Sequence, residues 1–241
     1  MSPAVRYWVV MPAAGVGRRF GSALPKQYAK LHGRSVIEWA LAPFLADVHC
    51  LGVVVVTAGE DRYWPAIAAR LPGLTNVAGG ASRSGSVRNG LRALAGRADS
   101  QDWVLVHDAA RPCVSPQEIG QLLHAAAAHP VGGILAVPAA DTLKRARSDG
   151  EIITTVEREG LWRALTPQMF RLGKLTEALE QAERTGRVPT DEAQALEWLG
   201  EHPLVVPGSA ANIKITGADD LLVAGAVLAA RQRPTTEASV P

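Results

Sequence analysis

The sequence has few cysteines and no long apolar run, and each shortage excludes a class of protein. Cys50 and Cys113 are its two cysteines in 241 residues, too few for a disulfide framework, and no histidine and cysteine cluster has zinc-site spacing. The N-terminal apolar run "YWVVMPAAG" is too short to span a bilayer, and no basic segment precedes it as in a signal peptide. We therefore expect a soluble, cytoplasmic protein that does not bind membranes.

An excess of one charge sign is also absent. The chain has 25 Lys and Arg residues against 23 Asp and Glu residues. This balance gives no indication of sequence-independent binding to nucleic acid or to an anionic membrane. Any basic site must therefore be local.

Short β-branched runs alternate with segments of helical period. The expected strands are Val5 to Met11, Leu51 to Thr57, Trp103 to His107 and Ile134 to Val137. The expected helices are Ser35 to Ala46, Pro65 to Leu71, Ser84 to Leu94 and Pro116 to Ala128, with Pro43 expected to kink the first or end it early. The alternation predicts an α/β fold with a mostly parallel sheet covered on both faces. We expect one domain over residues 1–233 and a flexible tail at 234–241.

The alternation stops after Pro138. Residues 141–162 form two strand-like runs around Ser148-Asp149-Gly150, which is typical of a hairpin. A lone hairpin is marginally stable in water, so this arm, about residues 138–163, is expected to project from the domain and pack on a second subunit. The sequence thus predicts a homodimer.

The stretch "VVMPAAGVGRRFGSALPKQY", from Val9, places glycines directly after a strand. Phe20 occupies the position where a dinucleotide loop needs its third glycine, and the Gly-Lys-Ser/Thr of an NTPase loop does not occur. Arg18, Arg19 and Lys26 resemble a clamp for a polyphosphate. A glycine turn beneath a solvated basic face explains these residues equally well.

The stretch "VLVHDAARPCV" places Asp108 at the carboxyl edge of the sheet, where open α/β sheets bind ligands. One carboxylate there suits Mg²⁺, which takes its other ligands from water and phosphates. The alternatives for Asp108 are a helix N-cap or an ion pair with Arg111. We expect His107 to be a hydrogen-bonded core histidine.

Four further motifs are weak individually. "NVAGGASRSGSVRNGL" predicts a glycine turn that opens a helix, and "RALTPQMF" an extended Thr166-Pro167 dipeptide that enters a turn. In "PTDEAQALEWLG", Thr190 is the expected N-cap. In "ANIKIT", Lys214 is expected in a strand, facing away from its neighbouring isoleucines.

Together, "PAAGVGRRF", "PKQY", "AGG", "HDAARP", "VEREGLW", "LTPQMF", "TDEA" and "NIKIT" resemble the 2-C-methyl-D-erythritol 4-phosphate cytidylyltransferase family of non-mevalonate isoprenoid synthesis. The resemblance spans Val9 to about Arg231. It implies a Rossmann-like nucleotidyltransferase domain whose arm builds a homodimer. It also implies CTP as substrate, Mg²⁺ as cofactor and transfer of CMP to methylerythritol phosphate with release of pyrophosphate.

The resemblance implies roles for individual residues as well. The catalytic set is Arg19 and Lys26, around the α-phosphate, with Arg158 and Lys214, which position the acceptor. The nucleotide-binding set is Ala13, Ala14, Gly15, Gly17, Lys26, Gly80, Ser86, Asp108 and Ala109, with Asp108 beside the metal. The substrate-binding set is Arg111, Thr142, Arg158, Thr190 and Lys214, with Arg158 expected to reach the neighbouring subunit's site. Ala211 stands where related enzymes often carry a second carboxylate.

Two other functions remain open at this point. One is a cytidylyltransferase for another polyol phosphate, such as ribitol 5-phosphate. The other is a non-catalytic nucleotide-binding dimer, which would have no need for the dispersed charged residues of one reaction. Phe20 disfavours an NAD-dependent oxidoreductase.

Overall fold

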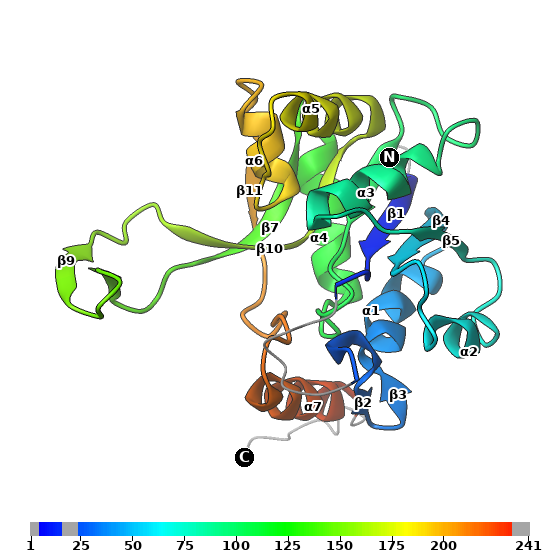
Figure 1. Ribbon diagram of the computed structural model, residues 1–241, viewed down its shortest axis with the longest axis horizontal. Helices are drawn as coiled ribbons and strands as arrows, with labels where there is room; N and C mark the ends of the chain where they lie inside the picture. Colours follow the sequence, from blue (N-terminus) through cyan, green and yellow to red (C-terminus); the bar gives the residue numbers. More distant parts are fainter. Residues whose placement is uncertain (1–4, 16–23, 233–241) are drawn as a thin grey trace, which may run out of the picture.

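The computed structural model describes residues 5–15 and 24–232, and one seven-stranded sheet organises them (Figure 1). The strand order is β11-β7-β10-β6-β1-β4-β5. The strands are β1 (Tyr7–Pro12), β4 (Cys50–Thr57), β5 (Thr75–Ala78), β6 (Trp103–Val106), β7 (Gly132–Pro138), β10 (Trp162–Arg171) and β11 (Leu204–Pro207). All neighbours are parallel except β10, which is antiparallel to both β6 and β7. The predicted mostly parallel sheet is confirmed.

Helices cover both faces of this sheet. One face packs against α1 (Val36–Leu45), α2 (Trp64–Ala68) and α4 (Pro116–Ala127), and the other against α3 (Arg83–Arg92), α5 (Leu172–Arg184) and α6 (Glu192–Glu197). Strand β1 contributes to both cores, because Val9 and Met11 enter the first while Trp8 and Val10 enter the second. A third, smaller core packs α7 (Ala218–Gln232) against the short strand β2 (Lys30–Leu31), which pairs with β3 (Arg34–Ser35).

Two local expectations were wrong in part. Pro43 does not end helix α1 early, because burial of Leu41 and Phe44 outweighs one lost hydrogen bond and the helix continues to Leu45. Thr166-Pro167 is extended as expected, but it lies inside β10 and does not enter a turn.

Two expectations about the C-terminal third were also wrong. The N-cap of α6 is Asp191, whose carboxylate accepts the Gln194 amide at 2.9 Å, so Thr190 lies outside the helix. The "ANIKIT" segment forms no strand, because the Ile215 amide donates to the Ala110 carbonyl of the loop after β6 and not to a neighbouring strand.

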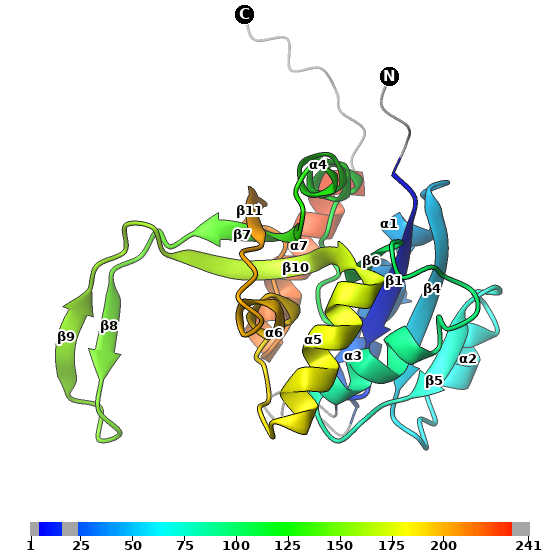
Figure 2. The same cartoon turned by 90° about the horizontal axis from the view of Figure 1, so that it is seen from above.

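The expected hairpin projects from the body of the molecule. Strands β8 (Leu143–Ala146) and β9 (Ile152–Val156) pair in a separate antiparallel sheet that stands apart in both Figure 1 and Figure 2. Gly150 has a φ of 93°, which glycine adopts without strain at the turn. The projecting arm is confirmed, whereas the expected tail at 234–241 lies outside the described residues.

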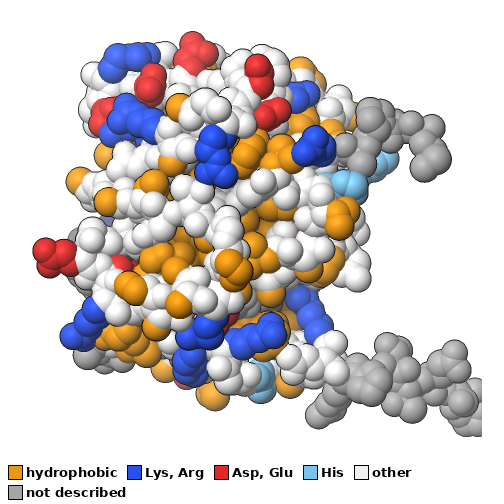
Figure 3. All heavy atoms as spheres, turned by 90° about the vertical axis from the view of Figure 1, so that its right-hand side faces the viewer, with side chains coloured by type: hydrophobic (Ala, Val, Ile, Leu, Met, Phe, Trp, Pro, Cys, Tyr) orange, Lys and Arg blue, Asp and Glu red, His pale blue; other side chains and the backbone are white. Residues whose placement is uncertain are grey.

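Two observations on the described residues concern possible binding to membranes or to nucleic acid. No helix within residues 5–15 and 24–232 combines the length and apolarity that a bilayer crossing requires. Figure 3 shows Lys and Arg side chains dispersed among hydrophobic and acidic ones on the face that carries α2.

Candidate functional site

A cavity of about 370 Å³ lies at the carboxyl edge of the sheet, beyond the ends of β1 and β6. Its walls come from the loops after these two strands, the turn that opens α3, the segment before β2, and the loop before α7. The lining residues are Pro12, Ala13, Ala14, Gly15, Lys26, Gln27, Gly80, Ala81, Ser82, Arg83, Ser86, Asp108, Ala109, Ala110 and Lys214. Ligands bind open α/β sheets at this edge.

The Gln27 side chain, which no sequence motif marks as functional, holds the loop after β1 in place. Gln27 is almost fully buried, and its Nε2 donates to the carbonyls of Ala13 (2.7 Å) and Gly15 (3.1 Å). Gly79 allows the opposite loop to approach, since a Cβ there would lie 2.4 Å from that of Ala14. The expected site residues Gly17 and Arg19, and the undecided Arg18, lie outside the described residues.

The opposite wall is the start of α3. Ser82 caps this helix by accepting the Gly85 amide at 3.0 Å. Ser86 Oγ accepts the Gly80 amide at 3.1 Å and donates to the Ser82 carbonyl at 2.9 Å, which folds the turn tightly onto the helix. A helix N-terminus carries partial positive charge, so this wall favours an anion.

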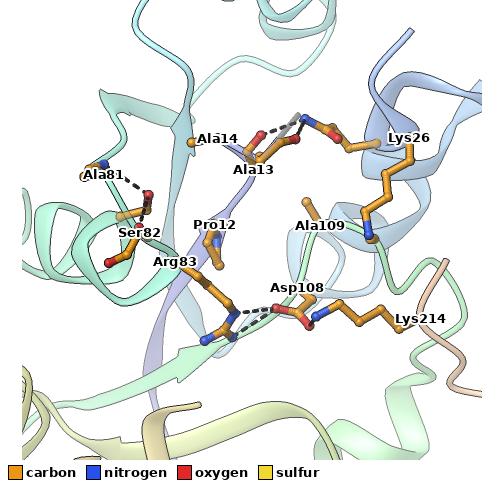
Figure 4. Close-up of a pocket in the computed structure, with 15 residues that line it drawn as sticks. Pro12, Ala13, Ala14, Lys26, Ala81, Ser82, Arg83, Asp108, Ala109 and Lys214 are labelled. Atoms are coloured by element: carbon orange, nitrogen blue, oxygen red, sulfur yellow. Dashed lines mark hydrogen bonds and ion pairs between the residues drawn. The ribbon is translucent and has the colours of Figure 1, made fainter. Parts of the chain in front are cut away.

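Asp108 is the acidic side chain that lines the cavity, and cations surround it (Figure 4). Arg83 Nε lies 3.0 Å from Oδ1, while Lys214 Nζ lies 2.8 Å and Arg111 Nε 3.7 Å from Oδ2. Its backbone amide donates to Thr166 Oγ1 at 3.1 Å. Burial opposes ionisation of Asp108, but the cations, Arg83 foremost, outweigh it and hold its pKa well below its usual range. The ion pair with Arg111, left open by the sequence, is therefore one contact among three.

The segment around Ile215 positions Lys214, which belongs to it, and Lys26, which donates a hydrogen bond to it. Burial of the Ile215 side chain and the 2.8 Å bond from its amide to the Ala110 carbonyl fix the chain beside the loop after β6. Lys214 thereby reaches Asp108, and Lys26 Nζ donates to the Ile215 carbonyl at 2.7 Å. The structure thus gathers three cations, Lys26, Arg83 and Lys214, at one cavity.

The sequence analysis missed the partnership of Arg83 with Glu192. Arg83 Nη1 and Nη2 donate to the two Glu192 carboxylate oxygens at 2.6 and 3.1 Å, and Glu192 is fully buried. Burial raises the pKa of Glu192, and the ion pair with Arg83 opposes this rise. Burial lowers the pKa of Arg83, but Glu192 and Asp108 outweigh this effect and raise it. Both residues stood in quoted motifs, but no spacing pattern connects positions 109 residues apart.

Other predicted site residues lie away from the cavity lining. Arg111 is buried and donates to the carbonyls of Asn212 (2.7 Å) and Ala164 (3.4 Å). It therefore links the loop after β6 to β10 and to the segment that carries Lys214. Thr142 and Arg158 lie on the projecting arm, and Thr190 directly precedes Asp191, the N-cap of α6. None of these four lines the cavity.

His107 is the core histidine that the sequence predicted. It is fully buried, with Nδ1 2.9 Å from Thr166 Oγ1 and Nε2 3.1 Å from the Arg111 carbonyl. Burial lowers the pKa of His107 to about 4, so the ring is neutral at pH 7.

The side chains that line the cavity fit a metal ion that takes most of its ligands from bound phosphates and water. Within the described residues, no cluster of three or more His, Cys, Asp or Glu side chains could hold a metal ion. Asp108 offers one carboxylate, and Mg²⁺ commonly binds through one or two carboxylates plus phosphate oxygens and water. Ala211 has no side-chain oxygen that could serve as a ligand.

The sheet edge, the helix N-terminus and the three gathered cations define an α/β protein with a site for a phosphorylated ligand. Comparison with known proteins gives the family. Residues 7–230 match the family model described as 2-C-methyl-D-erythritol 4-phosphate cytidylyltransferase. A protein of that name from Pseudomonas aeruginosa is 51% identical over 218 residues, 90% of this chain and 93% of that protein. One from Acidithiobacillus ferrooxidans is 50% identical over 232 residues, 94% of this chain and 98% of that protein.

Solved structures agree with the sequence comparison. A crystal structure of 4-diphosphocytidyl-2C-methyl-D-erythritol synthase superposes with a TM-score of 0.82 at 38% identity, covering 93% of this chain and 99% of that one. The Francisella tularensis 2-C-methyl-D-erythritol 4-phosphate cytidylyltransferase gives 0.80 at 36% identity, covering 92% and 99%. The chain belongs to the 2-C-methyl-D-erythritol 4-phosphate cytidylyltransferase family.

Proposed function

We propose that this protein transfers CMP from CTP to 2-C-methyl-D-erythritol 4-phosphate, which yields 4-diphosphocytidyl-2-C-methyl-D-erythritol and pyrophosphate for isoprenoid precursor synthesis. The observation that carries the proposal is the cavity lined by Lys26, Arg83 and Lys214, in which Arg83 and Lys214 contact the Asp108 carboxylate. Family membership supports the identity of both substrates.

The reaction requires electrostatic stabilisation and no general base. The acceptor phosphate is an anion at pH 7 and attacks the α-phosphorus of CTP directly, so that one P–O bond forms while the bond to pyrophosphate breaks. Two anions must approach each other while negative charge spreads over the α-phosphate oxygens and the leaving group. A cavity lined by three cations suits this task, and the neutral, buried His107 is not needed for it.

Lys26, Lys214 and Asp108 have separate roles in this reaction. Lys26, with Arg19, stabilises charge at the α-phosphate, and Lys214 holds the attacking phosphate. Asp108 would hold Mg²⁺, which when bound neutralises triphosphate charge. The loops at Ala13 to Gly17, at Gly80 and Ser86, and at Asp108 and Ala109 would enclose the nucleotide.

We also propose that the arm completes the site of a second subunit. Arg158 and Thr142 belong to the arm, and neither lines the cavity of its own chain. The arm exposes Ile152 and Ile153 by 65% and 53%, which a homodimer would cover. The Arg158 side chain donates to the Ala140 carbonyl at the base of the arm, which keeps this cation on the arm.

Sedimentation at micromolar concentration is expected to give a dimer. Burial of the two exposed isoleucines contributes to association, so Ile152→Ser/Ile153→Ser is expected to shift the equilibrium toward monomer. Val48→Ser, which removes an exposed apolar side chain far along the chain from the arm, serves as the control. A wild-type chain that sediments only as a monomer would refute the dimer.

Arg158→Ala is expected to impair use of methylerythritol phosphate, with a raised KM for that substrate. Mixing Arg158→Ala with Lys26→Ala subunits should restore part of the activity, because one site of each mixed dimer then combines an intact Lys26 with an intact arm. The measurement is pyrophosphate release before and after subunit exchange. Absence of any recovery in mixtures shown to contain mixed dimers would argue against shared sites.

Acceptor choice tests the proposed function against its nearest alternative. The protein is incubated with CTP and Mg²⁺ and with either methylerythritol phosphate or ribitol 5-phosphate, and pyrophosphate release is followed. Release with methylerythritol phosphate supports the proposal. Release with ribitol 5-phosphate alone would assign another polyol, and release with neither would favour a non-catalytic nucleotide-binding dimer.

A further inference from the structure

Glu192 is a fully buried carboxylate that the proposed reaction does not use. Both of its oxygens accept hydrogen bonds from Arg83, at 2.6 and 3.1 Å. A buried carboxylate is costly to desolvate, and a pair of this kind is weak support for stability in itself. Its position behind a residue that contacts Asp108 points to another purpose.

Strand β10 connects the start of α6, where Glu192 lies, to the loop after β6, where Asp108 lies. Gln168 on β10 donates to Asp191 at 3.0 Å and accepts the Ala193 amide at 3.0 Å, which fixes the start of α6 on either side of Glu192. On the same strand, Thr166 Oγ1 accepts the Asp108 amide at 3.1 Å. The backbone of Asp108 and the support of Glu192 are therefore anchored to one strand.

The two cations closest to Asp108 are held very differently. Arg83 contacts Oδ1 with two nitrogens at 3.0 Å and uses its remaining contacts on Glu192. Lys214 contacts Oδ2 with one nitrogen, and its side chain is 37% exposed. Arg111 Nε lies 3.7 Å from Oδ2, beyond hydrogen-bond distance. Lys214 thus has fewer contacts with Asp108 than Arg83 has and is the more exposed of the two.

We propose that Glu192 is a positioning residue that acts through Arg83. Glu192 accepts hydrogen bonds from both terminal nitrogens of Arg83, Nη1 and Nη2, which keeps the guanidinium on Asp108 Oδ1 and offsets its positive charge. Asp108 Oδ2 is then available to a divalent cation when Lys214 moves to a phosphate. The inference rests on the proposed function, because it takes Asp108 as the metal ligand. Residues behind a metal ligand typically change metal affinity by about 10- to 100-fold when altered.

The test measures metal binding without turnover. Mn²⁺ is titrated into the full chain with CTP and without acceptor, and free Mn²⁺ is followed by electron paramagnetic resonance. Glu192→Gln is expected to weaken Mn²⁺ binding by about 10- to 100-fold. Glu183→Gln, which removes the carboxylate partner of Arg88 elsewhere on α3, is the matched control and should leave the affinity unchanged.

A double-mutant cycle shows whether Glu192 acts through Arg83. In an Arg83→Met background, Glu192→Gln is expected to change Mn²⁺ affinity by less than about twofold. An unchanged affinity in the single Glu192→Gln variant, or an equal loss in both backgrounds, would overturn the inference. If Glu192→Gln alone does not fold, as thermal unfolding would reveal, a loss of Mn²⁺ affinity caused by Glu192→Gln within the Arg83→Met background would still overturn the inference. Pyrophosphate release by the wild type tests the proposed function separately, since this titration needs no reaction.

Discussion

Replacing Lys26 with alanine is expected to lower kcat by about 10² to 10³, equivalent to roughly 3–4 kcal/mol of transition-state stabilisation. Lys26 lines the cavity, and its ammonium group is fixed by the Ile215 carbonyl at 2.7 Å. A cation positioned in advance need not reorganise when charge develops on the α-phosphate, so its loss falls on the chemical step. The measurement is steady-state pyrophosphate release at saturating CTP and methylerythritol phosphate.

Lys30→Ala provides a matched control for this prediction. Lys30 lies four residues further along, its side chain is 60% exposed, and its ion pair with Glu38 spans 3.7 Å. Such a pair contributes little, so both kcat and thermal stability should stay close to wild type. Near-wild-type turnover by a folded Lys26→Ala protein would refute the assignment. Arg19→Ala, at a position outside the described residues, is expected to resemble Lys26→Ala.

Asp108→Asn is expected to lower kcat/KM by at least about 10² and to destabilise the protein by about 3–5 kcal/mol. The kinetic loss arises because the amide is a poor substitute for a carboxylate that holds Mg²⁺. The stability loss arises because Arg83, Lys214 and Arg111 lose the anion they share. Pyrophosphate release and urea unfolding measure the two effects.

The Asp108 variant needs a control for the loss of a negative charge. Asp219 lies exposed in the first turn of α7 and does not line the cavity. Asp219→Asn should leave kcat/KM unchanged and cost at most about 1 kcal/mol through the helix dipole. Equal kinetic losses in both variants would show that the Asp108 effect is not local.

The sequence could predict the parts of the fold that depend on local pattern. Strand β1 has a short apolar run, and the arm combines a turn signal with few apolar residues, so both were foreseen. Strand β10 was missed because it contains Pro167 and an irregular register between Ala164 and Gln168, where it pairs with β7. Its strand conformation is set by two neighbours that lie far away in the sequence.

The candidate site could be predicted only where a motif marked it. Lys214 was placed in the site by its motif, although its expected strand was wrong and a single buried isoleucine determines where it points. The ion pair between Arg83 and Glu192 could not be predicted from the sequence. It joins the first residues of two different helices, and such a contact leaves no periodic pattern in the sequence. Gln27 could not be predicted either, because it acts by donating hydrogen bonds to two backbone carbonyls, a contact that no sequence motif marks.

Label transfer from CTP tests the central claim most directly. The protein is incubated with Mg²⁺, methylerythritol phosphate and CTP radiolabelled at either the α- or the γ-phosphate. The account predicts that the α-label appears in the diphosphocytidyl product and the γ-label in pyrophosphate, because the acceptor phosphate attacks the α-phosphorus. Transfer of the γ-label to the acceptor, or retention of both labels in CTP, would contradict it.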